Sequence, residues 1–425
     1  MEIYLVGGAV RDKLLGLKIK DRDWLVVGAT PDEMKQQHYS QVGADFPVFL
    51  HPKTKEEYAL ARTERKQGHG YQGFECHASP EVTLEEDLLR RDLSINAMAM
   101  DSNEQVIDPF NGQADLKSKT LRHVSKAFTE DPLRILRVAR FAARFEPLGF
   151  HIANETLQLM QAMDKAGETK HLVSERIWQE TERALAEDSA WIFFETLKKT
   201  GSLQTLFPEI HRLFGIPQVE KYHPEIDCGV HAFMSLKAAC KLSQDPSVRF
   251  ASLIHDLGKA LSPKDNLPHH YGHEQKGLKP IKQLCQRLKL PNEYRDLALN
   301  VSEFHTHVHK VYELKSATIL KVLKQCDAFR RPERFKQMLL CCEADAKGRT
   351  GFEDTQYPQA QFFLEALKRT QAVSVGTLIK QRLIQQETLK ERSAGKEIGL
   401  KIDLERKARI QLLKREHAKT QHTTS

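Results

Sequence analysis

A glycine pair near the amino terminus has the residue types of a phosphate-binding turn. Gly7 and Gly8 follow the apolar run 3–6, which is typical of a buried strand, and precede Arg11. Glycine lets backbone N–H groups approach a phosphate closely, and the guanidinium adds a fixed positive charge beside it. The turn therefore predicts contact with a phosphorylated ligand.

Two carboxylates follow this turn at a spacing that suits metal binding. Asp21 and Asp23 lie two residues apart in the expected strand 21–27, so both side chains should leave the same face of that strand. Paired carboxylates bind hard divalent cations such as Mg²⁺. Together with the glycine turn, this pair predicts two-metal nucleotidyl transfer, in which catalysis comes mainly from positioning and electrostatics.

The elements that must hold these residues change character along the chain. The first 120 residues or so alternate short β-rich runs, such as 47–50 and 58–62, with helical stretches. Beyond residue 130 the spacing of apolar residues predicts long amphipathic helices. The clearest are 133–145, 155–163, 174–186 and 191–199. A chain of 425 residues with this change of pattern predicts an α+β fold of two or more domains.

Composition sets limits on partners and location. The formal net charge of +7 is compatible with a nucleic-acid partner but is too small on this length to prove one. Seven scattered cysteines give neither a disulfide framework nor a CxxC metal motif, which favours reduced thiols and a cytoplasmic location. No apolar run approaches bilayer length, so no membrane association is expected.

The motifs taken together resemble those of bacterial tRNA nucleotidyltransferases of class II, the CCA-adding enzymes, in the version that carries a C-terminal HD domain. The resemblance covers nearly the whole chain. Its carriers are Gly7 to Asp12, Asp21, Asp23, Arg90 to Ala97, Glu130 to Arg134, Arg137, Arg140, and His255-Asp256.

This resemblance implies a fold and a division of the chain. It implies a small mixed-sheet head similar to that of polymerase β, then a mostly helical neck, an HD-type helical body and a helical tail. We expect the head at 1–122, the neck at 123–212, the HD domain at 213–350 and the tail at 351–425. A glycine-rich stretch, 68–74, is expected to be a mobile loop near the site.

In the head, the resemblance assigns further residues to catalysis and triphosphate binding. Glu57 is the expected third carboxylate beside Asp21 and Asp23, with Glu56 as its competitor. Arg90 and Arg91 are neighbours on an expected helix and point in different directions, so only one should face the triphosphate. The family pattern selects Arg91, together with Gly8 and Arg11. It also implies that Asp92 and Asn96 handle the sugar, although a plain hydrogen-bonded pair on a helix is an equal alternative.

Asp131 and Arg134 are the expected template for base choice. Cytosine and adenine both present an amino donor beside a ring-nitrogen acceptor, and a carboxylate beside a guanidinium complements that edge. Uracil and guanine present a carbonyl beside an N–H, so they would be rejected. Helix capping by Asp131 before Pro132 is the competing interpretation. Arg137 and Arg140 continue the same helix, and the family pattern places them on nucleotide phosphate or base, well ahead of Arg144.

A second chemistry is expected at His255-Asp256. These neighbours lie in an apolar helix expected to end near Gly258, where adjacent imidazole and carboxylate groups can hold a metal ion. The HD pattern adds His231 upstream and a distant carboxylate, for which Asp345 and Asp327 compete. Imidazole ligands favour Ni²⁺, Mn²⁺ or Co²⁺ over Mg²⁺. His305 is carried only as a further candidate ligand.

The resemblance thus implies addition of C, C and A to tRNA 3′ ends from CTP and ATP, with Mg²⁺ in the head. It also implies a phosphatase or 2′,3′-cyclic phosphodiesterase activity that repairs RNA ends in the HD domain. Poly(A) polymerase shares the head motifs and is the main alternative, and an inactive RNA-binding protein is a weaker one. Whether the chain forms a homodimer is left open by the sequence.

Overall fold

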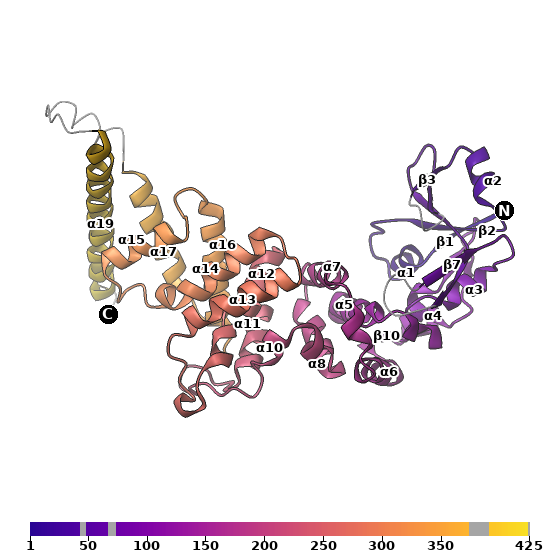
Figure 1. The fold of residues 1–425 in the computed structure, drawn as a ribbon, viewed down its shortest axis with the longest axis horizontal. Coiled ribbons are helices and arrows are strands. Elements are labelled where there is room, and N and C mark those ends of the chain that lie inside the picture. The colour runs from indigo at the N-terminus through magenta and orange to yellow at the C-terminus, as the bar shows by residue number, and fades with distance from the viewer. Residues whose placement is uncertain (43–47, 67–73, 374–390, 424–425) are drawn as a thin grey trace. The chain divides into compact units, whose positions relative to one another are not determined.

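The protein is described here by a computed structural model that covers residues 1–42, 48–66, 74–373 and 391–423. The chain divides into two compact units, Met1–Pro208 and Glu209–Ser425 (Figure 1). The first unit combines a sheet with helices, and every helix or strand element in the described residues of the second is a helix. The predicted α+β class is confirmed.

A seven-stranded mixed sheet forms the amino-terminal part of the first unit, in the order β3-β4-β5-β2-β1-β8-β9. Only β2 and β5 are parallel neighbours, and the other pairs are antiparallel. The strands are β1 (Glu2–Val6), β2 (Asp23–Val27), β3 (Ser40–Val42), β4 (Val48–Leu50), β5 (Glu57–Leu60), β8 (Ala99–Met100) and β9 (Val106–Ile107). The apolar β1, β2 and β5 lie next to one another in this order, as buried strands should.

Two expectations about these strands need correction. Asp21 precedes β2, which begins at Asp23. The expected strand 58–62 is two strands, because the chain leaves the sheet at Ala61, whose N–H donates to the Val26 carbonyl (2.8 Å), and continues as β6 (Arg62–Lys66). β6 pairs with β7 (Phe74–Ala78) in a separate two-stranded sheet. Of the expected loop 68–74, residues 68–73 lie outside the described residues and Phe74 opens β7.

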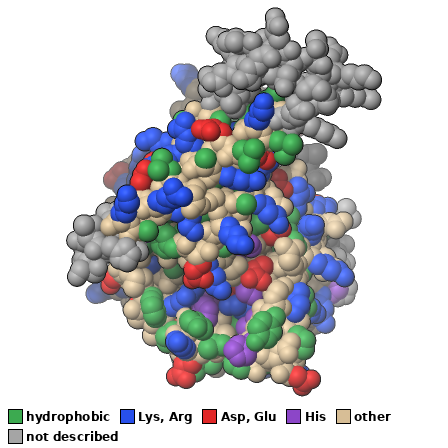
Figure 2. Space-filling model, turned by 90° about the vertical axis from the view of Figure 1, so that its left-hand side faces the viewer, with side chains coloured by type: hydrophobic (Ala, Val, Ile, Leu, Met, Phe, Trp, Pro, Cys, Tyr) green, Lys and Arg blue, Asp and Glu red, His purple; other side chains and the backbone are tan. Residues whose placement is uncertain are grey.

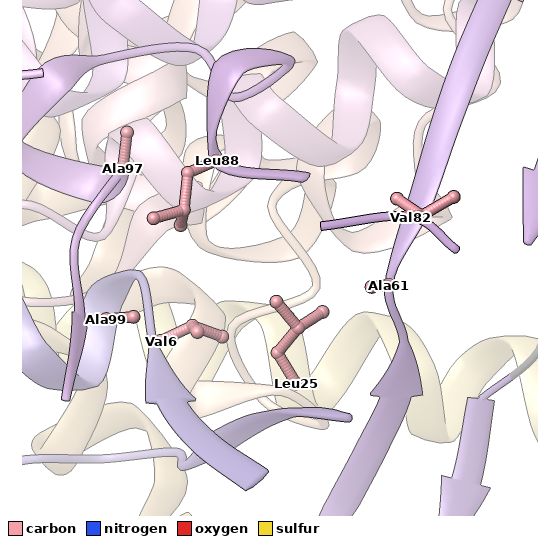
Figure 3. Close-up of a cluster of buried hydrophobic side chains, with 7 residues drawn as sticks. All are labelled: Val6, Leu25, Ala61, Val82, Leu88, Ala97 and Ala99. Carbon is pink, nitrogen blue, oxygen red and sulfur yellow. The ribbon is translucent and has the colours of Figure 1, made fainter. Parts of the chain in front are cut away.

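Buried side chains pack on both faces of the sheet. On one face, a cluster joins residues of β1, β2 and β8 to side chains from the segment between β5 and β8 (Figure 3). Its members are Val6, Leu25, Ala61, Val82, Leu88, Ala97 and Ala99. On the other face, Val26, Phe49, Tyr58 and Leu60 pack with Met34 of α2 (Pro31–Gln36). Because side chains alternate along a strand, Leu25 and Val26 serve opposite clusters.

Helices complete the first unit. α5 (Leu133–Phe145) matches its expected bounds, and the other expected helices differ from the structure by a residue or two at their ends. They are α6 (Asn154–Lys165), α7 (Ser174–Leu185) and α8 (Ala190–Thr200). α5 buries Ile135, Leu136 and Val138 on one face and packs against α7 and α8. Its other face carries the arginines considered below.

The second unit is a bundle of packed helices. α14 (Asn292–His309) contacts α12 (Pro246–Ile254), α13 (His273–Arg287) and α16 (Pro332–Lys347). The remaining long helices are α11 (Cys228–Leu242), α15 (Ser316–Gln325), α17 (Pro358–Gln371) and α19 (Glu391–Thr423). α19 packs against α15 and α17. Within the described ranges, none of the helices combines the length and apolarity that crossing a bilayer requires.

Candidate active sites

The first unit contains a cavity of about 1110 Å³. Eleven basic and six acidic side chains are among its lining residues, so its walls carry an excess of positive charge. All of the residues predicted for the head site line it: Gly8, Arg11, Asp21, Asp23, Glu57, Arg91, Asp92, Asn96, Asp131, Arg134, Arg137 and Arg140. The structure therefore brings together residues that are up to about 130 positions apart in sequence.

The three acidic residues lie at one end of two adjacent strands. Asp23 opens β2, Glu57 opens β5, and the two are partners in the parallel register. Asp21, two residues before Asp23, lines the same cavity without belonging to the strand. Glu56 is absent from the lining, since its carboxylate accepts the Trp24 indole N–H (3.1 Å). The geometry thus selects Glu57 over its neighbour.

These carboxylates fit a hard divalent cation by chemistry and by placement. Oxygen ligands from aspartate and glutamate are those that Mg²⁺ prefers. In the described chain, however, the ligand atoms of Asp21, Asp23 and Glu57 do not gather within 4.8 Å of one another. Desolvation raises the pKa of Asp23 above its usual value, the Arg91 guanidinium opposes this, and Asp21 adds to it. A nearby cation would favour the ionised form of Asp23 and so oppose this shift.

Gly7 is placed where a side chain would not fit. Its φ of +66° is in the region that favours glycine, and a Cβ there would lie 2.7 Å from Arg91 Nη1. Arg91 in turn donates to Asp87 (Nη2–Oδ2, 3.1 Å). The expected helical pair at 90–91 is wrong, because α3 (Leu84–Leu89) ends before Arg90. Asp87 holds both arginines by ion pairs, which sequence reasoning missed.

A buried polar network forms part of the cavity wall. Asp92 accepts from Asn96 (Nδ2–Oδ1, 2.9 Å) and from Arg137 (Nε–Oδ2, 2.7 Å). Burial alone would raise the pKa of Asp92, but the Arg137 guanidinium and the Asn96 amide hold it well below its usual range. Arg11 is 2% exposed and donates to Asp12 and Asn96. Asn96 lies in a 3-10 turn rather than one α-helical turn after Asp92, so the expected helical pairing is wrong although the hydrogen bond forms.

Asp131 and Arg134 both line the cavity, and both have partners within the protein. Asp131 Oδ1 accepts the Leu133 N–H (3.0 Å), so the expected capping interaction exists, although α5 begins one residue later than Pro132. Asp131 Oδ2 also pairs with Arg176 Nη2 (2.8 Å). Arg134 Nη1 donates to the Ala127 carbonyl (2.8 Å), which fixes its guanidinium at the wall.

Two more ion pairs of the helical wall escaped the sequence analysis. Arg140 Nε donates to Glu180 Oε2 (2.7 Å), and Arg144 Nη2 donates to Asp12 Oδ2 (2.9 Å). Arg144 lines the cavity like Arg137 and Arg140, although the sequence ranked it well below them. The only signal for these partners was the acidic residue type, because their pairing spans 40 residues or more.

The second unit holds a buried cluster of histidines and carboxylates. His231 on α11, His255 and Asp256 after α12, and Asp345 on α16 are each at most 2% exposed. His231 Nε2 lies 3.0 Å from Asp345 Oδ1, and His255 Nε2 lies 3.1 Å from Asp256 Oδ2. α12 ends at Ile254, earlier than the expected end near Gly258, and the chain turns at Asp256 into a 3-10 helix over Leu257–Leu261.

Asp345, not Asp327, lies in this cluster. Asp345 Oδ2 lies 3.6 Å from His255 Nε2 and 2.7 Å from His309 Nε2. Asp327 instead pairs with Arg330 (2.7 Å) at the surface. Burial would raise the pKa of Asp345, but the charges of His255, His309 and Arg349 hold it well below its usual range.

The donor set fits a transition metal ion. His231, His255 and Asp256 present ligand atoms within 4.8 Å of one another, as do His255, His305 and Asp345. Imidazole nitrogen combined with carboxylate oxygen is the ligand type of Ni²⁺, Mn²⁺, Co²⁺ or Zn²⁺ sites. His255 Nε2 is buried and has no hydrogen-bond partner. A nitrogen that binds a metal ion does not need one. Lys259 was not foreseen; its Nζ lies 2.6 Å from Asp256 Oδ2.

Comparisons with known proteins show the family of this chain. Residues 3–122 match the Poly A polymerase head domain, 149–214 the probable RNA and SrmB-binding site of polymerase A, and 229–331 the HD domain. A Multifunctional CCA protein of Teredinibacter turnerae is 55% identical over 97% of this chain and 98% of its own length. One of Thioalkalivibrio sulfidiphilus is 57% identical over 98% of this chain and 99% of its own. This chain belongs to the multifunctional CCA protein family.

Solved structures support the fold of this family member. A Thermotoga maritima CCA-adding enzyme complexed with tRNA-CCA is 20% identical, with a TM-score of 0.64, over 99% of this chain and 91% of that chain. A CCA-adding enzyme with CTP is 19% identical, with a TM-score of 0.63, over 96% of this chain and 87% of that one. At these identities the likeness concerns the fold alone.

Proposed function

We propose that this chain adds C, C and A to the 3′ ends of tRNA, using CTP and ATP. The observation that supports this most directly is one cavity that combines a carboxylate edge, an arginine-rich wall and the Asp131–Arg134 pair. We also propose the division into head (1–122), neck (123–212), HD domain (213–350) and tail (351–425). In this division, Asp21, Asp23 and Glu57 of the cavity belong to the head, and the base-selecting pair Asp131–Arg134 belongs to the neck.

Catalysis in the head depends on Asp21, Asp23 and Glu57, which would hold Mg²⁺. Bound there, Mg²⁺ supplies a lowered pKa for the attacking 3′-hydroxyl and charge compensation for the departing pyrophosphate. Arg91, fixed by Asp87, and Arg11 place positive charge opposite the triphosphate, and Gly8 keeps the backbone close to it. Asp92 and Asn96 orient the sugar.

Base choice depends on a carboxylate held beside a guanidinium. Arg176 and the Leu133 N–H fix Asp131, and backbone carbonyls fix Arg134, so neither side chain can turn to suit a different base. Arg137 and Arg140, each tied to an acid, line the path toward the phosphates. A uracil or guanine edge would leave charged groups unpaired, at a cost of about 1–3 kcal/mol each.

The HD domain would provide a separate phosphohydrolase for RNA ends carrying phosphate or 2′,3′-cyclic phosphate. His231, His255, Asp256 and Asp345 would hold the transition metal, which supplies activated water for attack on a phosphoester. Burial would raise the pKa of Asp256, but the charges of His255 and of Lys259, 2.6 Å away, hold it well below its usual value. The activity would prepare the terminus that the head extends.

The head proposal is tested with tRNA that lacks its terminal CCA and one labelled nucleotide at a time. Wild type should incorporate two C and then one A. Asp23→Ala and Glu57→Gln should each slow addition by about 100-fold or more, because metal binding contributes several kcal/mol to such reactions. Gel-shift affinity for tRNA should stay within about twofold.

The matched control is Glu56→Gln, the neighbouring acid outside the cavity. It should add CCA at a rate near that of wild type. Full activity of Asp23→Ala would refute the metal role. Long A tracts made by the wild type would instead support the alternative, poly(A) polymerase, which the head domain match alone does not distinguish.

The HD proposal is tested with His255→Ala. Hydrolysis of a 2′,3′-cyclic phosphate by Ni²⁺-loaded protein should vanish, while CCA addition should persist, because the two sites lie in different compact units. Asp23→Ala should show the opposite pattern. An HD activity unchanged in His255→Ala would exclude this site as its source.

A further inference from the structure

Three aromatic side chains are strongly exposed in the described chain, and all three lie in loops of the second unit. Tyr222 precedes α11, Tyr271 precedes α13, and Phe352 lies between α16 and α17. Their exposed fractions are 57%, 68% and 41%, whereas every other tyrosine, phenylalanine and tryptophan whose side chain is described is partly or fully buried. A single exposed ring needs no explanation, but three in neighbouring loops point to a partner. We call these three residues the aromatic rim.

Tyr271 lies in the loop that leads into the HD cluster. It is two residues before His273, whose Nε2 lies 3.3 Å from Asp256 Oδ1. The Tyr271 ring stacks on His269, with 5.7 Å between the ring centroids and 16° between the planes. Lys276 Nζ donates to the Tyr271 carbonyl (2.8 Å), which places a cation beside the ring.

Tyr222 has a similar position in the loop before α11. It is followed by His223, whose ring centroid lies 4.6 Å from that of His231 in the cluster. A cation is again close, because Lys221 Nζ lies 5.7 Å from the centroid of the Tyr222 ring.

Phe352 repeats this arrangement after α16. Its N–H donates to the Arg349 carbonyl (3.0 Å). The Arg349 guanidinium lies 3.4 Å from Asp345 Oδ1, so the cation next to this ring also contacts the cluster.

The three loops contact one another and connect the buried cluster with the surface. His270 Nε2 lies 3.0 Å from the Pro217 carbonyl, and the Thr350 N–H donates to Glu225 (3.5 Å). The residues that adjoin the rings in sequence and contact the cluster are partly exposed: His223, His273 and Arg349. A substrate that approaches the cluster from these residues therefore meets the aromatic rim.

An RNA end has the chemistry that suits this rim. Aromatic side chains stack on nucleobases of any sequence, and the bases available for stacking are the unpaired ones at ends, loops and bulges. Cations beside the rings suit the phosphates between those bases. In a nucleotide, one ribose joins the base to the phosphate, so a phosphate at the cluster leaves its base near the rim.

We propose that Tyr222, Tyr271 and Phe352 form a base-stacking rim of the HD site, which binds the unpaired nucleotides at the 3′ end of an RNA. This inference rests on the phosphohydrolase proposed above and names its substrate class. The site selects an RNA end with free bases over other phosphoesters.

The test compares two substrates of the Ni²⁺-loaded full-length protein. One is an RNA trinucleotide that ends in a 2′,3′-cyclic phosphate, and the other is glycerol 1,2-cyclic phosphate, which has the same reacting group but no base. Tyr222→Ala, Tyr271→Ala and Phe352→Ala should each raise KM for the trinucleotide about tenfold, the effect of losing one stacked base, with little change in kcat. The kcat/KM for the glycerol ester should stay near that of the wild type.

Two further variants and a spectroscopic signal separate stacking from a structural role. Tyr271→Phe keeps the ring and should keep the wild-type KM. Leu412→Ala removes an exposed apolar side chain of α19, which packs against α15 and α17, and should change neither substrate. With metal-free protein, a trinucleotide that carries 2-aminopurine as its last base should lose fluorescence on binding, and Tyr271→Ala should weaken this quenching.

The outcomes distinguish the rim from the activity on which it rests. Hydrolysis of neither substrate by the wild type would overturn the phosphohydrolase and the rim together. Hydrolysis of both, with alanine variants that affect the two substrates equally or not at all, would overturn the rim alone.

Discussion

At the scale of single residues, the chemistry depends on how partners fix charged side chains. Asp131 shows this most clearly, because its two oxygens have different neighbours, the Leu133 N–H and Arg176. Capping and base selection were rival interpretations of the sequence, yet the geometry allows both at once. The cap and the ion pair with Arg176 together hold the carboxylate in place at the cavity wall.

Asp131→Asn should therefore relax base choice while preserving the fold. An amide keeps one acceptor for the Leu133 N–H but adds an N–H₂ donor, which a uracil or guanine carbonyl can accept. We expect the preference for CTP over UTP, measured as a ratio of kcat/KM values, to fall about 5- to 150-fold, which corresponds to about 1–3 kcal/mol.

Lys126→Gln is the control for this prediction, because Lys126 is exposed, lies five residues earlier and is absent from the cavity lining. Its CTP-to-UTP ratio should equal that of the wild type. An unchanged ratio in Asp131→Asn would mean that the base is recognised elsewhere in the cavity.

At the scale of elements, close backbone contacts decide where the HD residues lie. Gly258 approaches the start of α13 so closely that a Cβ there would lie 1.9 Å from the His273 carbonyl and 2.6 Å from the Gly277 nitrogen. α12 ends at Ile254, and the 3-10 helix that follows, Leu257–Leu261, packs against α13 at this contact.

Gly258→Ala should push α13 outward, and with it His273. We expect a loss of about 1–3 kcal/mol in the free energy of unfolding, the usual cost of overpacking, measured by urea titration. Gly399→Ala on α19 is the control, because nothing lies within 4 Å of the added methyl group. It should stabilise the protein by up to about 1 kcal/mol. Equal stability of both variants would contradict the close packing at Gly258.

At the scale of the whole molecule, binding of tRNA should depend on distributed charge. Figure 2 shows Lys and Arg side chains spread over the viewed face, with Asp and Glu between them, rather than one basic block. The net charge of +7 is likewise modest for a chain of 425 residues. Affinity should then come from several weak phosphate contacts together with the shape of the RNA.

The dissociation constant for tRNA should accordingly rise steeply with salt. Arg183→Gln, an exposed side chain of the segment 149–214, should lower the slope of log Kd against log[salt] by about 1. Lys35→Gln on α2 in the head is the charge-matched control and should leave the slope unchanged. Slopes that match the wild type in both variants would exclude Arg183 from the RNA contact.

The sequence by itself determined what is local. Apolar runs predicted β1 and the part of β2 from Asp23 to Val27, and the helical pattern predicted α5 with the observed bounds, since these depend on which side chains must be buried. The glycine turn, the paired aspartates and His255-Asp256 were visible as neighbours in the chain. The family resemblance supplied the remaining residues of the head site and the upstream His231.

The tertiary structure alone decided every choice that depended on distance across the fold. It placed Glu57 rather than Glu56 in the cavity, and Asp345 rather than Asp327 beside His231. It also paired Asp131 with Arg176, 45 residues away, and turned His273 and His305 toward Asp256. A periodic pattern in the sequence does not predict such long-range contacts. The partner of a side chain depends on how helices and strands pack, and packing depends on many small contacts from the whole chain.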